Sequence, residues 1–349
     1  MSPAVGRGAS RLAALGWVAA AGGLLAAGLV GSVWWLGGEG RWAAAGGVEW
    51  RGPALAGPEP GTQRLMARLG GDEADVYLPV AAVRQQRSTG EPPRPLPAAL
   101  LLQGANVDKS HYATFAALLA KEGFVVVVPN HWRTFPPLPW LGRRMLLADQ
   151  RQIPATVAAL RQLNATAPPP WQGGIDGEQL VVVGHSMGGL AGLDALANRC
   201  RFPLCIGRFA RPAALRGGVF VGTDLRGHSH GPVAPIDTDG LPVALITGSR
   251  DGASKPEDVT ATWRQLRTPR HELLQIQGAN HYALTNSSQP VNPPGLPPLH
   301  ADANAATADQ RATLEQLANW SAAFLREAVG PSAAPQQPGG EGAKRKPGP

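Results

Sequence analysis

Cysteine is scarce in this sequence, because the 349 residues include only Cys200 and Cys205. Two thiols without a matching pair of histidines are too few ligands for a structural zinc site, so we expect no bound metal. An even number of cysteines suits a disulfide in an exported protein, although two buried thiols would give the same pattern. The sequence therefore favours a Cys200–Cys205 disulfide without excluding free thiols.

Clusters of basic residues interleaved with aromatic ones are also missing, which argues against a nucleic-acid partner. The net charge of +7 arises largely at the two ends of the chain. Residues 1–45 and 331–349 each contribute about +2, leaving about +3 for the rest, which is close to neutral for a body of this size.

Charged residues are absent from Leu12 to Gly38, a run longer than the roughly 20 apolar residues that span a bilayer. Arg7 and Arg11 precede the run, which predicts a cytoplasmic N-terminus and an exported body. A cleaved signal peptide is the alternative, with the small residues at 43–45 as its cleavage site. Either interpretation predicts a membrane-anchored or secreted protein whose main domain lies outside the cytoplasm.

The composition divides the chain into four parts. Residues 1–38 form the anchor or signal segment, and residues 39–60, rich in Gly, Pro and Ala, are predicted to be a linker. Residues 61–330 are predicted to fold as one domain. The tail, residues 331–349, has too little apolar surface to bury and is predicted to be disordered.

Short continuous apolar runs alternate with helical stretches between residues 61 and 330. Runs of this kind are typical of strands buried on both faces of a parallel sheet, so we expect an α/β fold with a mostly parallel central sheet and helices on both faces. Residues 64–68 and 74–78 suit an antiparallel pair at its leading edge. The other predicted strands are Ala98–Leu102, Phe124–Val128, Leu180–Val183, Gly218–Val221, Val243–Thr247 and Leu273–Ile276, and the predicted helices are Tyr112–Lys121, Met187–Ala197 and Leu314–Ala328.

The segment Gly184-His185-Ser186-Met187-Gly188-Gly189 follows a predicted strand and opens a predicted helix. This is the G-x-S-x-G pattern of a nucleophile elbow, in which a sharp turn exposes the serine hydroxyl. The same turn places the Met187 amide where it can stabilise an oxyanion. The pattern therefore predicts Ser186 as a nucleophile.

A serine nucleophile needs a base and a third group that orients the base, and in this type of fold they follow in the order serine, acid, histidine. Asp251 comes directly after the predicted strand Val243–Thr247, and His281 comes after the next strand. We expect a Ser186–Asp251–His281 triad, with Asp258 as the next candidate for the acid.

Two further residues are expected at the site. The second oxyanion donor should come from the loop after Ala98–Leu102, and we assign the Ala105 amide, with Asn106 as the alternative. Trp132 follows the strand Phe124–Val128, where it could line an apolar substrate pocket or serve only in packing.

The chain resembles the α/β-hydrolase superfamily, in particular cutinase-like polyester hydrolases and bacterial lipases, and its stretch from Leu101 to Trp132 also resembles plant-type chlorophyllases. The resemblance implies the triad named above, with Met187 and Ala105 as oxyanion donors. It covers roughly residues 60–330 and is carried by residues 103–104, 122–127, 149–151, 184–189, 248–251 and 278–281.

The sequence thus predicts a serine hydrolase that cleaves carboxylic esters through an acyl-enzyme on Ser186, with no cofactor. Its expected partners are a small-molecule or lipid-like ester and, through the N-terminal segment, a membrane. A chlorophyllase-like, thioester or peptide hydrolase remains open because the triad alone does not choose the acyl group. A membrane-tethered binding protein on a hydrolase scaffold is the non-catalytic alternative.

Overall fold

The computed structural model describes residues 48–69, 71–80, 95–135, 142–166, 173–226 and 232–330. All of them belong to the second of two compact units, residues 40–349. The expected anchor or signal segment and the expected disordered tail lie outside the described residues. Within the described ranges, no helix is both long enough and apolar enough to cross a bilayer.

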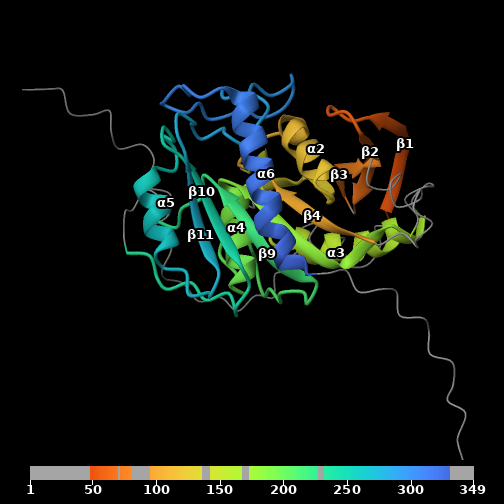
Figure 1. The fold of residues 1–349 in the computed structure, drawn as a ribbon, viewed down its shortest axis with the longest axis horizontal. Coiled ribbons are helices and arrows are strands. Elements are labelled where there is room, and N and C mark those ends of the chain that lie inside the picture. The colour runs from red at the N-terminus through yellow and green to blue at the C-terminus, as the bar shows by residue number, and fades with distance from the viewer. Residues whose placement is uncertain are drawn as a thin grey trace, which may run out of the picture. The chain divides into compact units, whose positions relative to one another are not determined.

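A large mixed sheet forms the centre of the domain (Figure 1). In the described part of the chain nine strands join it, in the order β1-β2-β3-β5-β4-β8-β9-β10-β11. Six neighbouring strands of this order run parallel, namely β5, β4, β8, β9, β10 and β11. The other three, β1, β2 and β3, pair antiparallel with one another, and β3 pairs antiparallel with β5. Their bounds are β1 Val48–Ala56, β2 Thr62–Leu69, β3 Asp72–Pro79, β4 Leu96–Leu102, β5 Val125–Asn130, β8 Ile175–His185, β9 Leu215–Val221, β10 Val243–Gly248 and β11 His271–Ile276.

The predicted α/β class with a mostly parallel central sheet is confirmed, as is the antiparallel pair at its leading edge, now β2 and β3. The linker prediction for residues 39–60 differs from the structure, because β1 occupies Val48–Ala56 within it. Among the described strands β1 pairs only with β2, and its register shifts between Arg51 and Leu55 around Pro53. Proline is tolerated on an edge strand or at a bulge, so a Gly- and Pro-rich segment can still form a strand here.

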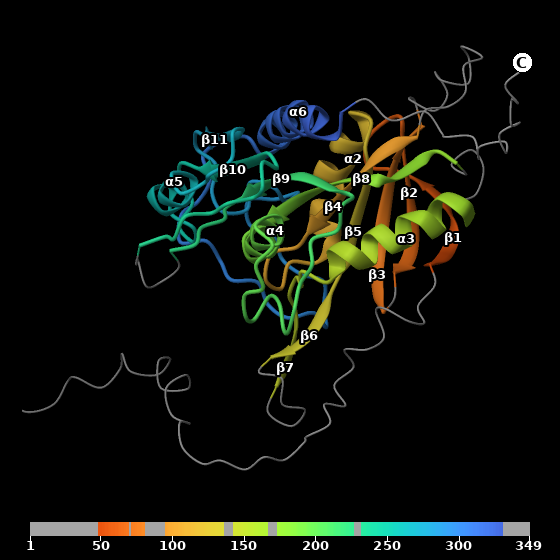
Figure 2. The ribbon, with the colours of Figure 1, turned by 90° about the horizontal axis from the view of Figure 1, so that it is seen from below.

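Helices cover both faces of the sheet (Figure 2). Helices α2 (Ala113–Lys121) and α6 (Gln310–Val329) pack on one face, while α3 (Gln152–Thr166) and α4 (Met187–Leu196) pack on the other. The apolar side chains accordingly form two separate buried clusters, one on each side of the strands. Helix α5 (Pro256–Trp263) follows β10, and a 3-10 turn, η2 (Lys109–Tyr112), precedes α2.

A small antiparallel hairpin leaves the sheet directly after β5. It consists of β6 (Trp132–Phe135) and β7 (Arg143–Leu146), and Figure 2 shows it projecting beyond the central strands. Because β4, β5, β8, β9, β10 and β11 are parallel, the loops that follow them all lie at one edge of the sheet. This carboxyl edge is where open α/β sheets bind ligands.

Candidate active site

Ser186 stands at the junction of β8 and α4 with a left-handed backbone, φ 52° and ψ −119°. A non-glycine residue in such a conformation costs on the order of 1–3 kcal/mol, so neighbouring contacts must hold it there. The Ser186 amide donates to the Val221 carbonyl over 2.9 Å, and the Ser186 carbonyl accepts from the Leu190 amide over 3.1 Å. The predicted elbow is therefore present as a strained turn, and its serine side chain remains partly exposed.

Three glycines allow this turn to form. A Cβ on Gly184 would lie 2.5 Å from the Gly189 Cα, and a Cβ on Gly189 would lie 1.8 Å from the Thr223 Oγ1. A Cβ on Gly188 would lie 2.2 Å from the Leu102 carbonyl oxygen. These distances are far inside van der Waals contact, so the start of α4 rests on the end of β4 and on the loop that follows it.

Asp251 and His281 form the predicted pair. The His281 Nδ1 lies 3.0 Å from each carboxylate oxygen of Asp251, and both residues are buried. Asp251 Oδ1 also accepts from the amides of Ala253 and Ser254, over 3.0 and 2.7 Å. Since an ionised carboxylate only accepts hydrogen bonds, Nδ1 carries the proton in the neutral ring and Nε2 is left as a base.

Gly222 brings this pair next to the elbow. It follows Val221, which accepts the Ser186 amide, and a Cβ on it would lie 3.0 Å from His281 Nδ1 and 3.1 Å from Asp251 Oδ2. Ser186, Asp251 and His281 thus gather at the ends of neighbouring strands. Among the described residues, no hydrogen bond joins the Ser186 hydroxyl to His281. Catalytic hydrogen bonds are often long until substrate binds, so a triad does not require this bond in the free protein.

The alternative acid, Asp258, lies in α5 and forms an ion pair with Arg226 at 3.0 Å. Its carboxylate therefore neutralises an arginine, whereas the carboxylate of Asp251 is the one in contact with His281.

Hydrogen bonds in the loop after β4 distinguish between Ala105 and Asn106, the two candidates for the second oxyanion donor. The Asn106 amide donates to the Leu146 carbonyl over 2.7 Å, and the Gly104 amide donates to the Tyr112 hydroxyl over 2.9 Å. Between them, the Ala105 amide has no acceptor among the described residues, and neither does the Met187 amide in the first turn of α4. The two free amides are those assigned from the sequence, and Asn106 is engaged elsewhere.

A buried chain of hydrogen bonds lies beneath the site. The His185 Nε2 donates to the His281 carbonyl over 2.9 Å, and the Tyr112 hydroxyl, 3.0 Å away, donates to His185 Nδ1. Burial, reinforced by the charge of His281, lowers the pKa of His185 to about 3, and burial also raises the pKa of Tyr112. His185 is therefore stable in the neutral form that these bonds require. The hydrogen bonds from Gly104 through Tyr112 and His185 fix the backbone of His281 relative to the loop that carries Gly104.

Asp302 is a site residue that the sequence does not reveal. Its Oδ2 accepts from the His281 amide over 2.7 Å, and its Oδ1 accepts from the Gly252 amide over 3.1 Å. The side chain thus ties the loop of the base to the loop of the acid. A lone aspartate in a loop has no local pattern that would mark it for this role.

A cleft of about 480 Å³ opens beside the loop that carries Ala105. Asn106 and Trp132 line it, so Trp132 lies in the wall of a cavity. The guanidinium of Arg144 stacks over the Trp132 ring, 4.4 Å from its centroid. Within the described ranges, no cluster of three or more His, Cys, Asp or Glu side chains is arranged to hold a metal ion.

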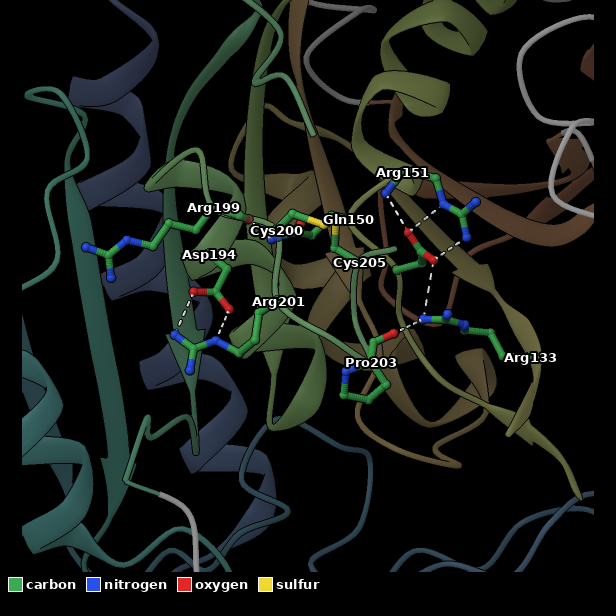
Figure 3. Close-up of a disulfide and its surroundings, with 10 residues drawn as sticks. Arg133, Gln150, Arg151, Asp194, Arg199, Cys200, Arg201, Pro203 and Cys205 are labelled. Carbon is green, nitrogen blue, oxygen red and sulfur yellow. Dashed lines mark hydrogen bonds and ion pairs between the residues drawn. A yellow bond between two sulfur atoms is a disulfide. The ribbon is translucent and has the colours of Figure 1, made fainter. Parts of the chain in front are cut away.

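Cys200 and Cys205 are joined in a disulfide that closes a short loop after α4 (Figure 3). The Gln150 side chain donates to the Arg199 carbonyl over 2.7 Å, and the Gln150 amide donates to the Leu204 carbonyl over 3.0 Å. Arg133 donates to the Pro203 carbonyl, as Figure 3 shows, and pairs with Asp149 at 3.3 Å. The loop therefore supports the hairpin that bears Trp132 and stands apart from the triad contacts.

Comparison of the sequence with protein-family models and with curated proteins gives no match.

Proposed function

We propose that this protein is a serine hydrolase of carboxylic esters built on an α/β-hydrolase fold. The observation that carries the proposal is the strained Ser186 turn beside the Asp251–His281 pair, with Gly222 so near that a Cβ on it would lie 3.0 Å from His281 Nδ1 and 3.1 Å from Asp251 Oδ2. A left-handed serine between a strand and a helix is costly, and proteins retain such strain where it serves a function.

The reaction begins when the Ser186 Oγ attacks the ester carbonyl carbon and His281 Nε2 accepts the hydroxyl proton. Asp251 holds the imidazole in the required tautomer and stabilises the imidazolium. The amides of Ala105 and Met187 donate to the oxyanion, and loss of one such donor typically costs about 3–4 kcal/mol of transition-state stabilisation.

The tetrahedral intermediate then collapses. The bond to the alcohol oxygen breaks, His281 returns its proton to that oxygen, and the acyl group remains on Ser186. A water molecule attacks the acyl carbon while His281 accepts its proton. The second collapse releases the carboxylic acid and restores the Ser186 hydroxyl, so each step uses groups of this chain, the ester and water.

A fluorophosphonate probe tests the proposal, because it labels only an activated serine. We expect the folded full-length protein to be labelled and to hydrolyse p-nitrophenyl esters, and Ser186→Ala to lose labelling and all but about one thousandth of the turnover. Matching circular dichroism spectra and unfolding midpoints would show that the variant is folded. Wild-type protein that is folded yet neither labelled nor active would favour the binding-protein alternative.

We also propose that the uncharged run Leu12–Gly38 carries the domain out of the cytoplasm. Cell fractionation with N-terminal sequencing distinguishes the two routes. An intact N-terminus in the membrane fraction supports an anchor, and a mature chain that begins near Gly46 supports a signal peptide. Soluble cytoplasmic protein would contradict both.

A further inference from the structure

The cleft beside the proposed oxyanion hole has a charge pattern of its own. Its lining comes from the β6–β7 hairpin and from residues 295–298, which together we call the cleft wall, and from Asn106. Arg143 and Arg144 lie in this lining, and both are exposed.

Neither Arg143 nor Arg144 has a carboxylate partner among the described residues. Arg133, on the same hairpin, differs because it pairs with Asp149. The sequence contains no acidic residue from His131 to Ala148 and none from His281 to Ala301, so neither segment of the cleft wall supplies a carboxylate of its own. Apart from Arg133, which Asp149 neutralises, the cleft wall therefore contributes two positive charges and no negative charge.

One of these charges is also held in place. The Arg144 guanidinium stacks on Trp132 at 4.4 Å, which restricts the side chain while leaving the N–H groups at its edge free to donate. A planar guanidinium presents paired donors that match the two oxygens of a carboxylate. Beside them lie the apolar surfaces of Trp132, Leu296 and Pro297. This combination suits an apolar chain that ends in an anion.

Hydrogen bonds fix the cleft wall relative to the oxyanion loop. Asn106 exchanges two bonds with Leu146 at the end of β7: its amide donates to the carbonyl over 2.7 Å, and its Oδ1 accepts from the amide over 3.2 Å. On the other side, Asn292 Nδ2 donates to the Asn106 carbonyl over 2.6 Å, and Asn106 Nδ2 donates to the Pro298 carbonyl over 3.4 Å.

The position of Arg144 relative to the oxyanion loop follows from this attachment. Arg144 precedes Leu146 by two residues, which is roughly 7 Å along a strand. A substrate whose carbonyl oxygen rests on the Ala105 amide therefore meets the arginines several bonds away from the ester.

We infer that the preferred esters carry an anionic group, such as a carboxylate, several bonds from the scissile carbonyl, and that Arg143 and Arg144 select for it. This inference rests on the proposed function and specifies its substrate class. The two arginines act on binding of the remote end of the substrate, so they change which ester is cleaved and leave the chemistry at Ser186 unaltered.

Matched pairs of substrates test the inference on the full-length protein. One member is a p-nitrophenyl half-ester of adipic or suberic acid, and the other is the same compound with its free acid capped as a methyl ester. A second pair places the carboxylate on the alcohol portion. We expect kcat/KM to favour the anionic member of at least one pair by about five- to tenfold at low salt. Added NaCl should reduce that preference by screening.

The double variant R143Q/R144Q should abolish the preference while leaving turnover of the neutral ester within about twofold. The matched control is R161Q/R216Q, which removes the same charge from α3 and from the amino end of β9, remote from the carboxyl edge. It should keep the preference.

Equal turnover of charged and neutral esters by the wild type would overturn the inference and leave the proposed function standing. So would an identical response of the two double variants, because the effect would then come from net charge. Absence of hydrolysis for every ester, together with absence of probe labelling, would overturn both.

Discussion

Two regions of the carboxyl edge are built in opposite ways. The loops that carry the proposed triad, residues 184–189, 222–223, 248–252 and 278–282, which we call the triad loops, meet through backbone and glycine contacts that leave no space for a Cβ. The cleft wall consists of exposed arginines and proline-rich chain, and a Cβ on Gly295 would meet nothing within 4 Å. Under the proposed function, the reaction depends on a tightly packed backbone arrangement, whereas substrate choice depends on exposed side chains that can be replaced.

Asp251→Asn should have the largest effect of any substitution in the triad loops short of removing the nucleophile or the base. Asparagine can hold the His281 ring in the wrong tautomer, and we expect kcat/KM to fall by about 10⁴, as the corresponding change does in trypsin. Steady-state kinetics on a neutral p-nitrophenyl ester measure the loss.

Asp258→Asn is the control for this substitution, because Asp258 contacts Arg226 and should leave the rate within an order of magnitude. If Asp258→Asn were the more damaging change, the acid would have been misassigned.

Gly188→Ala should unfold or disable the protein without changing any polar group. The new Cβ would lie 2.2 Å from the Leu102 carbonyl oxygen and 2.5 Å from that of Gln103, and neither backbone atom can yield cheaply. We expect a loss of about 3 kcal/mol in the free energy of unfolding, measured in urea, together with loss of activity.

Gly71→Ala is the matched control, because its Cβ would meet nothing within 4 Å and its stability should change by less than about 0.5 kcal/mol. Equal stability of the two alanine variants would contradict the tight packing that we describe for the triad loops.

Burial of His185 within the triad loops should make the free energy of unfolding of the protein depend on pH. Its pKa is about 3 in the folded protein, because of burial, and near 6.5 when unfolded, so between these values the unfolded chain binds more protons. Stability should therefore fall as the pH drops below about 6, by up to about 1.4 kcal/mol per pH unit.

Urea unfolding between pH 4 and 7 compares wild type with His185→Gln, in which this part of the slope should disappear. His300→Gln, which changes an exposed side chain outside the triad loops, should keep the wild-type slope. Parallel slopes for wild type and His185→Gln would show that His185 is not held neutral by burial.

The smallest effect should come from the disulfide behind the cleft wall. For a loop of sequence separation 5, chain entropy predicts that Cys200→Ser/Cys205→Ser loses about 2 kcal/mol of stability. Thermal unfolding measures this loss, and reduction of the wild type should reproduce it.

Turnover of a neutral ester should stay within about threefold in the same variant, since the loop contacts Arg133 and its hairpin. A folded double variant without activity would place the disulfide in the reacting part of the site instead.

The two regions also differ in how much of them the sequence predicts. Ser186 can be predicted as the nucleophile because the elbow is a local feature. Its glycines lie close together in the chain and are all required by one sharp turn. Asp251 and His281 follow from a simple rule about strand ends, which works because the strands are parallel. The choice of Ala105 over Asn106 depends on the Leu146 carbonyl, about 40 residues away, so no local pattern decides it.

Other features depend on tertiary contacts from the outset. Asp302 and Tyr112 become part of the site only through hydrogen bonds to distant residues. The strand β1 exists because β2 offers it an edge, which outweighs its linker-like composition. The β6–β7 hairpin is made of two four-residue strands, too short for a periodic signal.

The order of the strands along the chain also determines when the candidate site is complete during translation. Ser186 follows β8, near the middle of the sheet, while His281 follows β11, the last of the described strands in both the chain and the sheet order. In sequence, 96 residues separate the elbow's His185 from His281. At about 5–20 residues per second a ribosome needs roughly 5–20 s to make that stretch, so the emerging chain presents a serine without its base. Under the proposed function the chain stays inert until β11 and the loop after it join the sheet, and ribosome-bound chains that end before His281 should fold in part yet fail to react with fluorophosphonate.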